Sequence, residues 1–132
     1  MIKNISLLTE TMKDFSFQKI ESIHGFFLHY QNQSFQDSCV LDVDFVIRDQ
    51  AREYIARFRF THPNSIKFES GGIFHQMSIE MYDIGDRGWE NKKYEVIDYE
   101  DESLHFYCTD IEIISVREAG MKELSHGNYT SA

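Results

Sequence analysis

The sequence has few of the prolines and glycines that mark a flexible linker between domains. It contains 1 proline, Pro63, and 7 glycines among 132 residues, and it has neither a low-complexity tract nor an internal repeat. A chain of this length fits one domain with a single core. We therefore expect one β-rich domain over residues 1–118, followed by a C-terminal tail over residues 119–132 that lacks a strand pattern.

Long apolar runs are also missing. The apolar start of the chain stops at Glu10, which is too early for the core of a signal peptide. No stretch approaches the roughly 18 apolar residues that cross a membrane. The 2 cysteines, Cys39 and Cys108, each lie inside an apolar run, far apart in sequence. These features favour a cytoplasmic protein with two buried, reduced thiols over one with a disulfide or a metal pair.

Basic residues are outnumbered by acidic ones. The chain has 13 Lys and Arg against 22 Asp and Glu, so its formal net charge is −9. This balance argues against nucleic acid as a direct partner, because phosphate binding needs clusters of Lys and Arg. It also disfavours an anionic membrane surface. It permits a basic protein partner.

What the sequence does have is a series of β-branched and aromatic runs separated by short polar breaks. This pattern predicts antiparallel strands packed as a sandwich or as a curled, barrel-like sheet. No helical insert of the length that a parallel βαβ unit needs is visible. Leu8, Met12 and Phe15 follow helical spacing, so a short helix is expected within residues 5–16. The predicted strands cover residues 20–30, 38–48, 53–61, 65–69, 75–84, 92–98, 103–109 and 111–117.

One hairpin can be predicted in register. Apolar residues occupy the odd positions of 38–48 and the even positions of 53–60. If paired residue numbers sum to 101, the apolar faces match and the outer face sets Asp42 against Arg59 and Asp44 against Arg57. This register gives the two carboxylates arginine partners on a solvated face, in place of a role in binding a metal or a substrate.

The acidic residues concentrate in one stretch. Residues 80–112 hold 11 acidic and 3 basic residues, nearly the whole net charge. Two turn-like breaks in this stretch, 83–88 and 98–102, are bordered by aromatic residues. Acidic loops beside exposed aromatics suit a protein interface, because aromatics anchor a partner and charge steers it; the alternative is a solvated acidic surface that keeps the protein soluble. The residues expected to contact a partner are Tyr82, Asp83, Asp86, Trp89, Asp98, Tyr99, Glu100, Asp101 and Glu102.

No pattern for catalysis, a metal or a cofactor is found. The 6 histidines show no HExxH, HxH or HxxxH spacing, although His75 and His105 could meet across strands. His105 and Cys108 are three apart on a strand and would point to opposite faces. The pair Gly71-Gly72 precedes a strand-like run, so it predicts a turn and no phosphate loop. Gly25, beside two phenylalanines, indicates a bulge or a close backbone approach.

The order of several segments resembles a known group of proteins. Residues 33–40 open a β-run, residues 54–60 lead into 64–68, and residues 94–98 reach an acidic turn before 104–113. This order resembles small β-rich immunity proteins encoded beside bacterial polymorphic or contact-dependent toxins. Those families often begin with a Ser-Phe-His-Asp-like stretch, and this chain has Gln36 where the His would be. The resemblance implies a non-enzymatic protein that binds and blocks one cognate toxin without a cofactor.

Three other functions stay open. A curled sheet with 11 phenylalanines, 7 tyrosines and 1 tryptophan could enclose a cavity for a small apolar ligand. An unpaired sheet edge could join two copies into a homodimer. Acids such as Glu80 and Glu112 could assemble into an enzyme site only in the folded chain.

Overall fold

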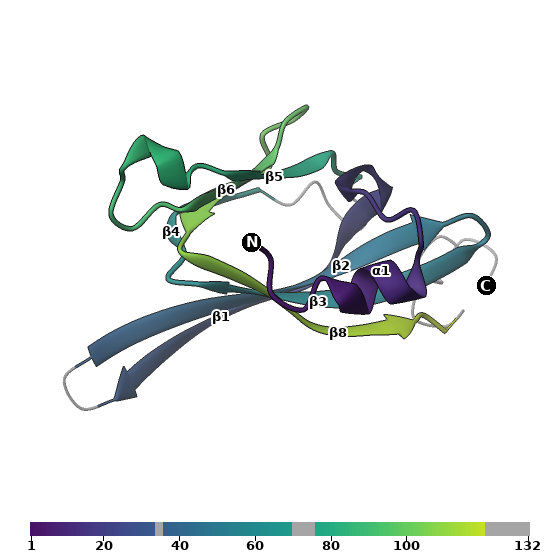
Figure 1. Ribbon diagram of the computed structural model, residues 1–132, viewed down its shortest axis with the longest axis horizontal. Helices are drawn as coiled ribbons and strands as arrows, with labels where there is room; N and C mark the ends of the chain where they lie inside the picture. Colours follow the sequence, from purple (N-terminus) through teal and green to yellow (C-terminus); the bar gives the residue numbers. More distant parts are fainter. Residues whose placement is uncertain (34–35, 70–75, 121–132) are drawn as a thin grey trace.

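The protein is a sandwich of two antiparallel sheets, seen in a computed structural model that describes residues 1–33, 36–69 and 76–120 (Figure 1). Each sheet has four strands, and neither closes into a barrel, so the sandwich expectation is confirmed and the barrel alternative is wrong. Sheet A contains, in spatial order, β1 (Ile20–Gln33), β2 (Gln36–Asp49), β3 (Arg52–Thr61) and β8 (Asp110–Glu118). Sheet B contains β4 (Asn64–Phe68), β7 (Leu104–Cys108), β6 (Tyr94–Asp98) and β5 (Ile79–Asp83).

The predicted hairpin register is confirmed. In the β2–β3 pair, Leu41 faces Phe60, and Asp42 and Asp44 face Arg59 and Arg57. Apolar alternation and opposite charges demand the same register, which explains why this part of the fold is readable from the sequence.

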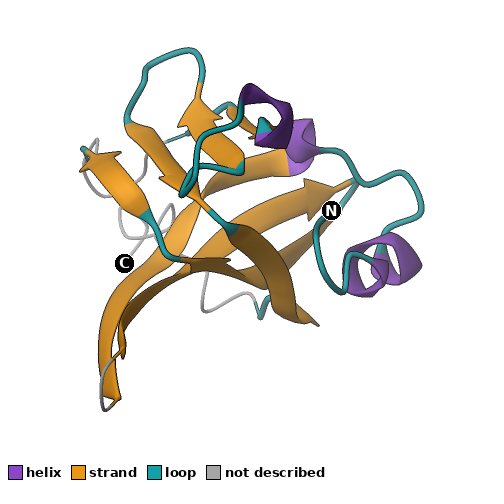
Figure 2. Cartoon of the chain, turned by 60° about the vertical axis from the view of Figure 1, so that its left-hand side comes forward, coloured by secondary structure: helices purple, strands orange, loops and turns teal. Residues whose placement is uncertain are grey.

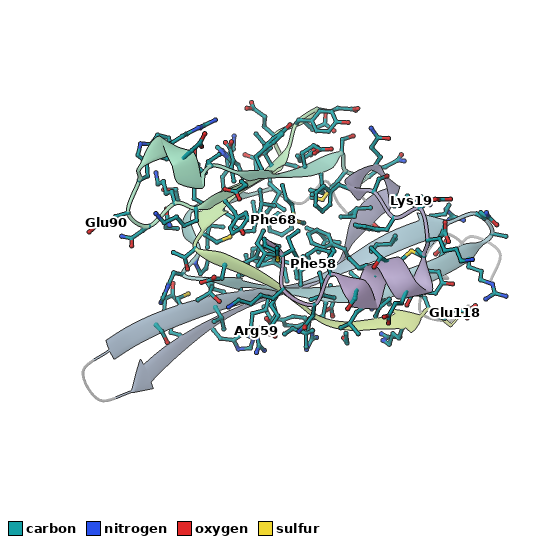
Figure 3. All side chains as sticks on the ribbon, in the orientation of Figure 1. Lys19, Phe58, Arg59, Phe68, Glu90 and Glu118 are labelled. Carbon is teal, nitrogen blue, oxygen red and sulfur yellow. The ribbon has the colours of Figure 1, made fainter. Side chains whose placement is uncertain are left out.

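The core lies between the sheets. Alternate residues of β2 and β3, including Phe45 and Phe58, are fully buried. The Phe60 ring meets the Phe106 ring edge to face at 4.8 Å between centroids, and this contact joins sheet A to sheet B. Figure 3 shows the side chains that fill the space between the two layers, with Phe58 and Phe68 labelled among them.

The N-terminal segment covers one end of the core. Its α-helix α1 spans only Ser6–Thr11 and is followed by a short 3₁₀ helix, η1 (Phe17–Lys19), so the expected helix is present but shorter. The predicted apolar stripe does face inward, because Leu8 and Met12 are buried and Phe15 packs against the core. No helix in the described ranges is both long and apolar enough to cross a membrane.

The chain departs from regular strand pairing at Met77 and at Gly25. The strand predicted at 75–84 begins only at Ile79, because the Met77 N–H donates to the Glu21 carbonyl of sheet A and Met77 therefore precedes sheet B. The predicted bulge at Gly25 is confirmed by a register shift between Ile23 and Gly25. A Cβ on Gly25 would lie 2.6 Å from the Phe27 ring, which explains the need for glycine. His75, Gly71 and Gly72 lie outside the described residues, as does most of the tail expected at 119–132.

Candidate functional site

The two acidic breaks lie at opposite ends of sheet B. In the β5–β6 pair, Asp83 faces Tyr94 at one end and Ile79 faces Asp98 at the other. The loop 84–93 therefore leaves one end of the hairpin and the turn 99–102 leaves the other, as Figure 1 shows. Strands of five residues are about 16 Å long. The nine residues expected to form one interface thus divide into two separate groups.

The first group is the acidic turn, which we define as Tyr99, Glu100, Asp101 and Glu102. All four residues are exposed, and the turn contains three carboxylates and no base. The Tyr99 N–H donates to the Ser78 carbonyl at 3.0 Å, and the Glu102 N–H donates to the Asp98 carbonyl at 2.8 Å. Glu102 has a left-handed backbone conformation, with φ of 52°, which closes the turn.

Asp98 differs from its neighbours, because it is fully buried. Its carboxylate accepts hydrogen bonds from the Ser78 N–H at 3.1 Å, the Ser103 N–H at 3.4 Å and the Ser103 hydroxyl. Asp98 was expected to contact a partner, but the structure leaves none of its surface exposed for such a contact. The residue holds the turn from inside, and the charges available to a partner are those of the acidic turn.

The environment of Asp98 favours its charged form. Burial by itself raises the pKa of this carboxyl. Hydrogen bonds from the Ser103 side chain and from the backbone N–H groups of Ser78, Ser103 and Asp101 together outweigh burial, so the pKa is lowered below its ordinary value. Hydrogen bonds to a charged carboxylate are stronger than those between neutral groups, so Asp98 ties Ser78 and Ser103, which lie on either side of the acidic turn, to the base of that turn.

The second group, at the other end of sheet B, is organised around Trp89. We define the Trp89 cluster as Arg87, Trp89, Lys92 and Tyr107. The Trp89 and Tyr107 rings pack edge to face at 6.0 Å between centroids, and the Lys92 ammonium lies 4.3 Å from the Tyr107 centroid. The Arg87 guanidinium lies 5.6 Å from the Trp89 centroid. Cations therefore lie within cation–π distance of the half-buried Tyr107 ring and of the exposed Trp89 ring.

The loop that carries Trp89 is not an acidic surface. Its acids Asp83, Asp86 and Glu90 are balanced by the three bases of residues 87–93. The Asp83 carboxylate accepts the Gly85 N–H at 2.9 Å, where the 3₁₀ helix η2 (Gly85–Arg87) begins. The prediction that residues 83–90 present an acidic surface to a partner is thus weakened, because basic residues lie in the same loop. Figure 3 shows Glu90 pointing outward from this loop.

Sequence reasoning missed Tyr107 and His105 as surface residues. Both lie on the outer face of sheet B, opposite to the buried Leu104, Phe106 and Cys108. His105 Nε2 lies 2.8 Å from a carboxylate oxygen of Glu95 on the neighbouring strand. The strict alternation along β7 was a sufficient signal for this face. Tyr82, expected as a partner contact, is exposed on β5 and faces Glu95 in the register.

The carboxylates of Asp42 and Asp44 belong to the framework. Arg57 and Arg59 each form a bidentate pair with their partner, with N–O distances of 2.8 and 3.0 Å in both pairs. The pairing is as expected, but the face is less solvated than expected, because only 4% of the Asp42 side chain is exposed. Phe27 faces Asp42 in the β1–β2 register, and its ring lies 5.2 Å from the Arg57 guanidinium.

The prediction of two buried thiols is confirmed for Cys108 and is wrong for Cys39, which is only half-buried. Cys108 is buried in the core, whereas His105 lies on the opposite face of the same strand. Burial raises the pKa of the Cys108 thiol to about 12, so the thiolate that a nucleophile requires is scarce at neutral pH. Across the part of the chain that the structure describes, no group of three or more His, Cys, Asp and Glu could hold a metal ion.

Comparison with known proteins gives no family for this chain. No family model, no curated protein and no solved structure matches it. The resemblance to immunity proteins therefore stays a prediction.

Proposed function

We propose that this protein is a non-enzymatic, acidic binding protein that inhibits a basic partner through the acidic turn, and that the partner is a cognate bacterial toxin. The single observation that supports a binding role most strongly is the buried Asp98 carboxylate, which holds the turn while Tyr99, Glu100, Asp101 and Glu102 stay exposed. A turn that is already ordered loses little conformational entropy when it binds. The toxin assignment comes from the resemblance in segment order alone.

The chemistry of the acidic turn suits a basic surface. Three exposed carboxylates next to one exposed tyrosine give both electrostatic steering and an aromatic contact. Many toxin domains cut nucleic acids and are basic, so an acidic inhibitor would be steered to them.

Isothermal titration calorimetry with the product of the adjacent gene tests this function. We expect tight binding that weakens as salt increases, because salt screens exposed charges beyond a Debye length of about 8 Å at physiological ionic strength. Loss of the partner's toxic activity on binding would support inhibition. Binding with no effect on activity would rule out an inhibitor, and absence of binding would remove the toxin as partner.

A second candidate, carriage of a small apolar ligand, is favoured by one cleft. The cleft has a volume of about 540 Å³ and lies between the N-terminal segment and β5, outside the space between the sheets. Ile2, Ile5, Phe15 and Phe17 line it, with Glu80 among its polar residues. This volume is within the range of small-molecule sites. A native mass spectrum tests the candidate: a co-purified molecule lost in an Ile5→Trp variant supports it, and a bare chain contradicts it.

A further inference from the structure

The hairpin formed by β1 and β2 extends beyond the sandwich. Both strands have 14 residues, which makes each about 47 Å long, whereas the strands of sheet B have 5. Figures 1 and 2 show the far half of the hairpin projecting away from sheet B. β3 pairs with β2 as far as Val40, so the two-stranded part of the hairpin is only its far end, where residues 30–33 pair with residues 36–39. An isolated two-stranded hairpin is marginally stable in water, so this end of the molecule would gain from a further strand.

The outer edge of this hairpin is β1, the first strand of sheet A. In the described part of the chain, β2 is the only strand that pairs with β1. On its other side, one backbone contact is present near the start of the strand, where Met77 donates to Glu21. Within the described ranges, no strand therefore borders the outer side of β1 between Phe26 and Tyr30.

β1 has register shifts near its start, at Ile20/Ser22 and Ile23/Gly25, but beyond Gly25 the described part of this edge carries no charged residue or proline that would protect it. Residues 22–33 contain no Lys, Arg, Asp, Glu or Pro, in a chain of which 27% of the residues are charged.

The opposite edge of sheet A, β8, is covered and charged. The Lys3 N–H donates to the Ile111 carbonyl, and the Ile113 N–H donates to the Lys3 carbonyl. β8 also carries charged side chains. Charges and covering segments are the usual defence against pairing with another chain.

Apolar side chains of β1 are exposed on both faces of the hairpin. Phe27 is 43% exposed, Leu28 is 38% exposed and Tyr30 is 76% exposed. Phe27 and Leu28 point to opposite faces because they are adjacent on a strand. Sheet B covers Phe26, whose ring stacks on the Phe68 ring of β4 at 4.6 Å between centroids. Phe27, Leu28 and Tyr30 stay exposed, so a partner strand would remove apolar surface from water on both faces.

We propose that the β1 edge between Phe26 and Tyr30 pairs with the same edge of a second copy of this chain. Antiparallel pairing about a two-fold axis at Leu28 sets Leu28 beside its own copy, Phe27 beside His29 and Phe26 beside Tyr30. No Lys, Arg, Asp or Glu meets another across this contact. Sheet A of one copy and sheet A of the other become one continuous eight-stranded sheet. This inference does not depend on the toxin as partner.

Charge selects a second copy over an unrelated strand. Each molecule has a net charge of −9, so most surface contacts between two copies are repulsive. The β1 edge is the long strand edge from which that charge is absent, and the neutral strand that matches it is β1 itself. A partner that presents a charged strand would find no opposite charge on this edge to pair with. The symmetric arrangement is the common form of homodimer.

Sedimentation equilibrium at high micromolar concentration tests the proposal. We expect a mass of twice 15.6 kDa for the unchanged protein. Leu28→Lys and Leu28→Glu should each sediment at half that mass, because like charges then face each other at the axis. A mixture of the two variants should restore the doubled mass. Ile66→Lys on β4, where the side chain is 36% exposed, is the matched control and should stay dimeric.

Three results would overturn the proposal: a monomeric unchanged protein, a dimer that persists in both Leu28 variants, or a mixture of the variants that stays monomeric while each is folded by circular dichroism. Hydrogen exchange gives an independent readout that a folding defect would not imitate. In the unchanged protein, protection of amides between Phe26 and Tyr30 should rise with protein concentration. Protection that rises at β4 instead would place the contact elsewhere and contradict the β1 edge.

Discussion

The two ends of sheet B contain similar residues and organise them in different ways. At the turn end, Asp98 is buried and the exposed carboxylates of the acidic turn have no base among them. At the loop end, cations lie over the Trp89 and Tyr107 rings and the local charges balance. Acidic residues near aromatics therefore do not define one kind of surface. Which residue is buried, and which bases the fold brings near, decides whether charge is available to a partner.

The largest expected effect is at the turn end. Asp98→Ala would leave the Ser78 N–H and the two Ser103 donors without their acceptor in a buried place. Each unsatisfied buried donor costs about 1–3 kcal/mol, so we expect a loss of roughly 3 kcal/mol in the free energy of unfolding, measured with urea. Asp101→Ala, an exposed neighbour, is the control and should change stability by less than about 0.5 kcal/mol. Equal effects of the two changes would contradict the anchoring role.

The second expectation concerns pH. Because the folded-state pKa of Asp98 is lowered, its contribution to stability is present above the unfolded pKa of about 3.9 and is lost as pH falls through the folded value. The stability difference between the unchanged protein and Asp98→Asn should therefore be constant near neutral pH and shrink in acid. Urea unfolding across this pH range measures it. A difference that grows in acid would mean that the carboxyl is protonated in the folded protein.

At the loop end, Gly88 has the backbone conformation that most clearly requires glycine. Its φ is 75°, a left-handed conformation, and no atom would touch an added Cβ. Gly88→Ala should therefore cost about 1 kcal/mol through backbone strain alone. Gly85→Ala in the same loop is the matched control, because its φ is not left-handed and its nearest neighbour is the carboxylate of Asp83. If Gly85→Ala proved more harmful, sterics and not backbone strain would control this loop.

The smallest expected effect is on the Trp89 cluster. Lys92→Met removes the ammonium that lies over both rings and should cost about 0.5 kcal/mol, since exposed cation–π contacts are weak. Trp89 is the one tryptophan in the chain, so its fluorescence reports directly on the loop. Lys67→Met on β4 changes charge equally and should leave the fluorescence unaltered. A loss as large as that of Asp98→Ala would erase the contrast between the two ends.

Much of the fold could be predicted, because local and cross-strand patterns agree. The β2–β3 register followed from apolar alternation and from the two Asp–Arg pairs, which each require the same alignment. Strand ends were less accurate where a residue bonds to the other sheet, as Met77 does. An aspartate at the start of a predicted turn is assumed to be exposed, so the burial of Asp98 was not predicted from the sequence. Its position two residues after Val96 would have placed it on the inner face.

The separation of the candidate residues into two groups at opposite ends of sheet B could also have been predicted from the sequence. One strand, β6, lies between the two acidic breaks, and the loops that flank a strand leave it at opposite ends. The basic residues around Trp89 were visible in the sequence, but their contacts with Tyr107 depend on pairing between β6 and β7. The neutral β1 edge required the strand order, which the sequence does not reveal.

The central claim is that the exposed charge at the turn end recognises a basic partner. The most direct measurement is calorimetric titration of the adjacent gene product, at two salt concentrations, with two double variants. Glu100→Lys with Asp101→Lys changes the turn end, and Asp86→Lys with Glu90→Lys changes the loop end; each moves the net charge from −9 to −5. We expect the turn variant to bind about tenfold more weakly, a loss of about 1.4 kcal/mol, and with less salt dependence, while the loop variant loses much less. Equal losses from both variants, or none from the turn variant, would contradict the account.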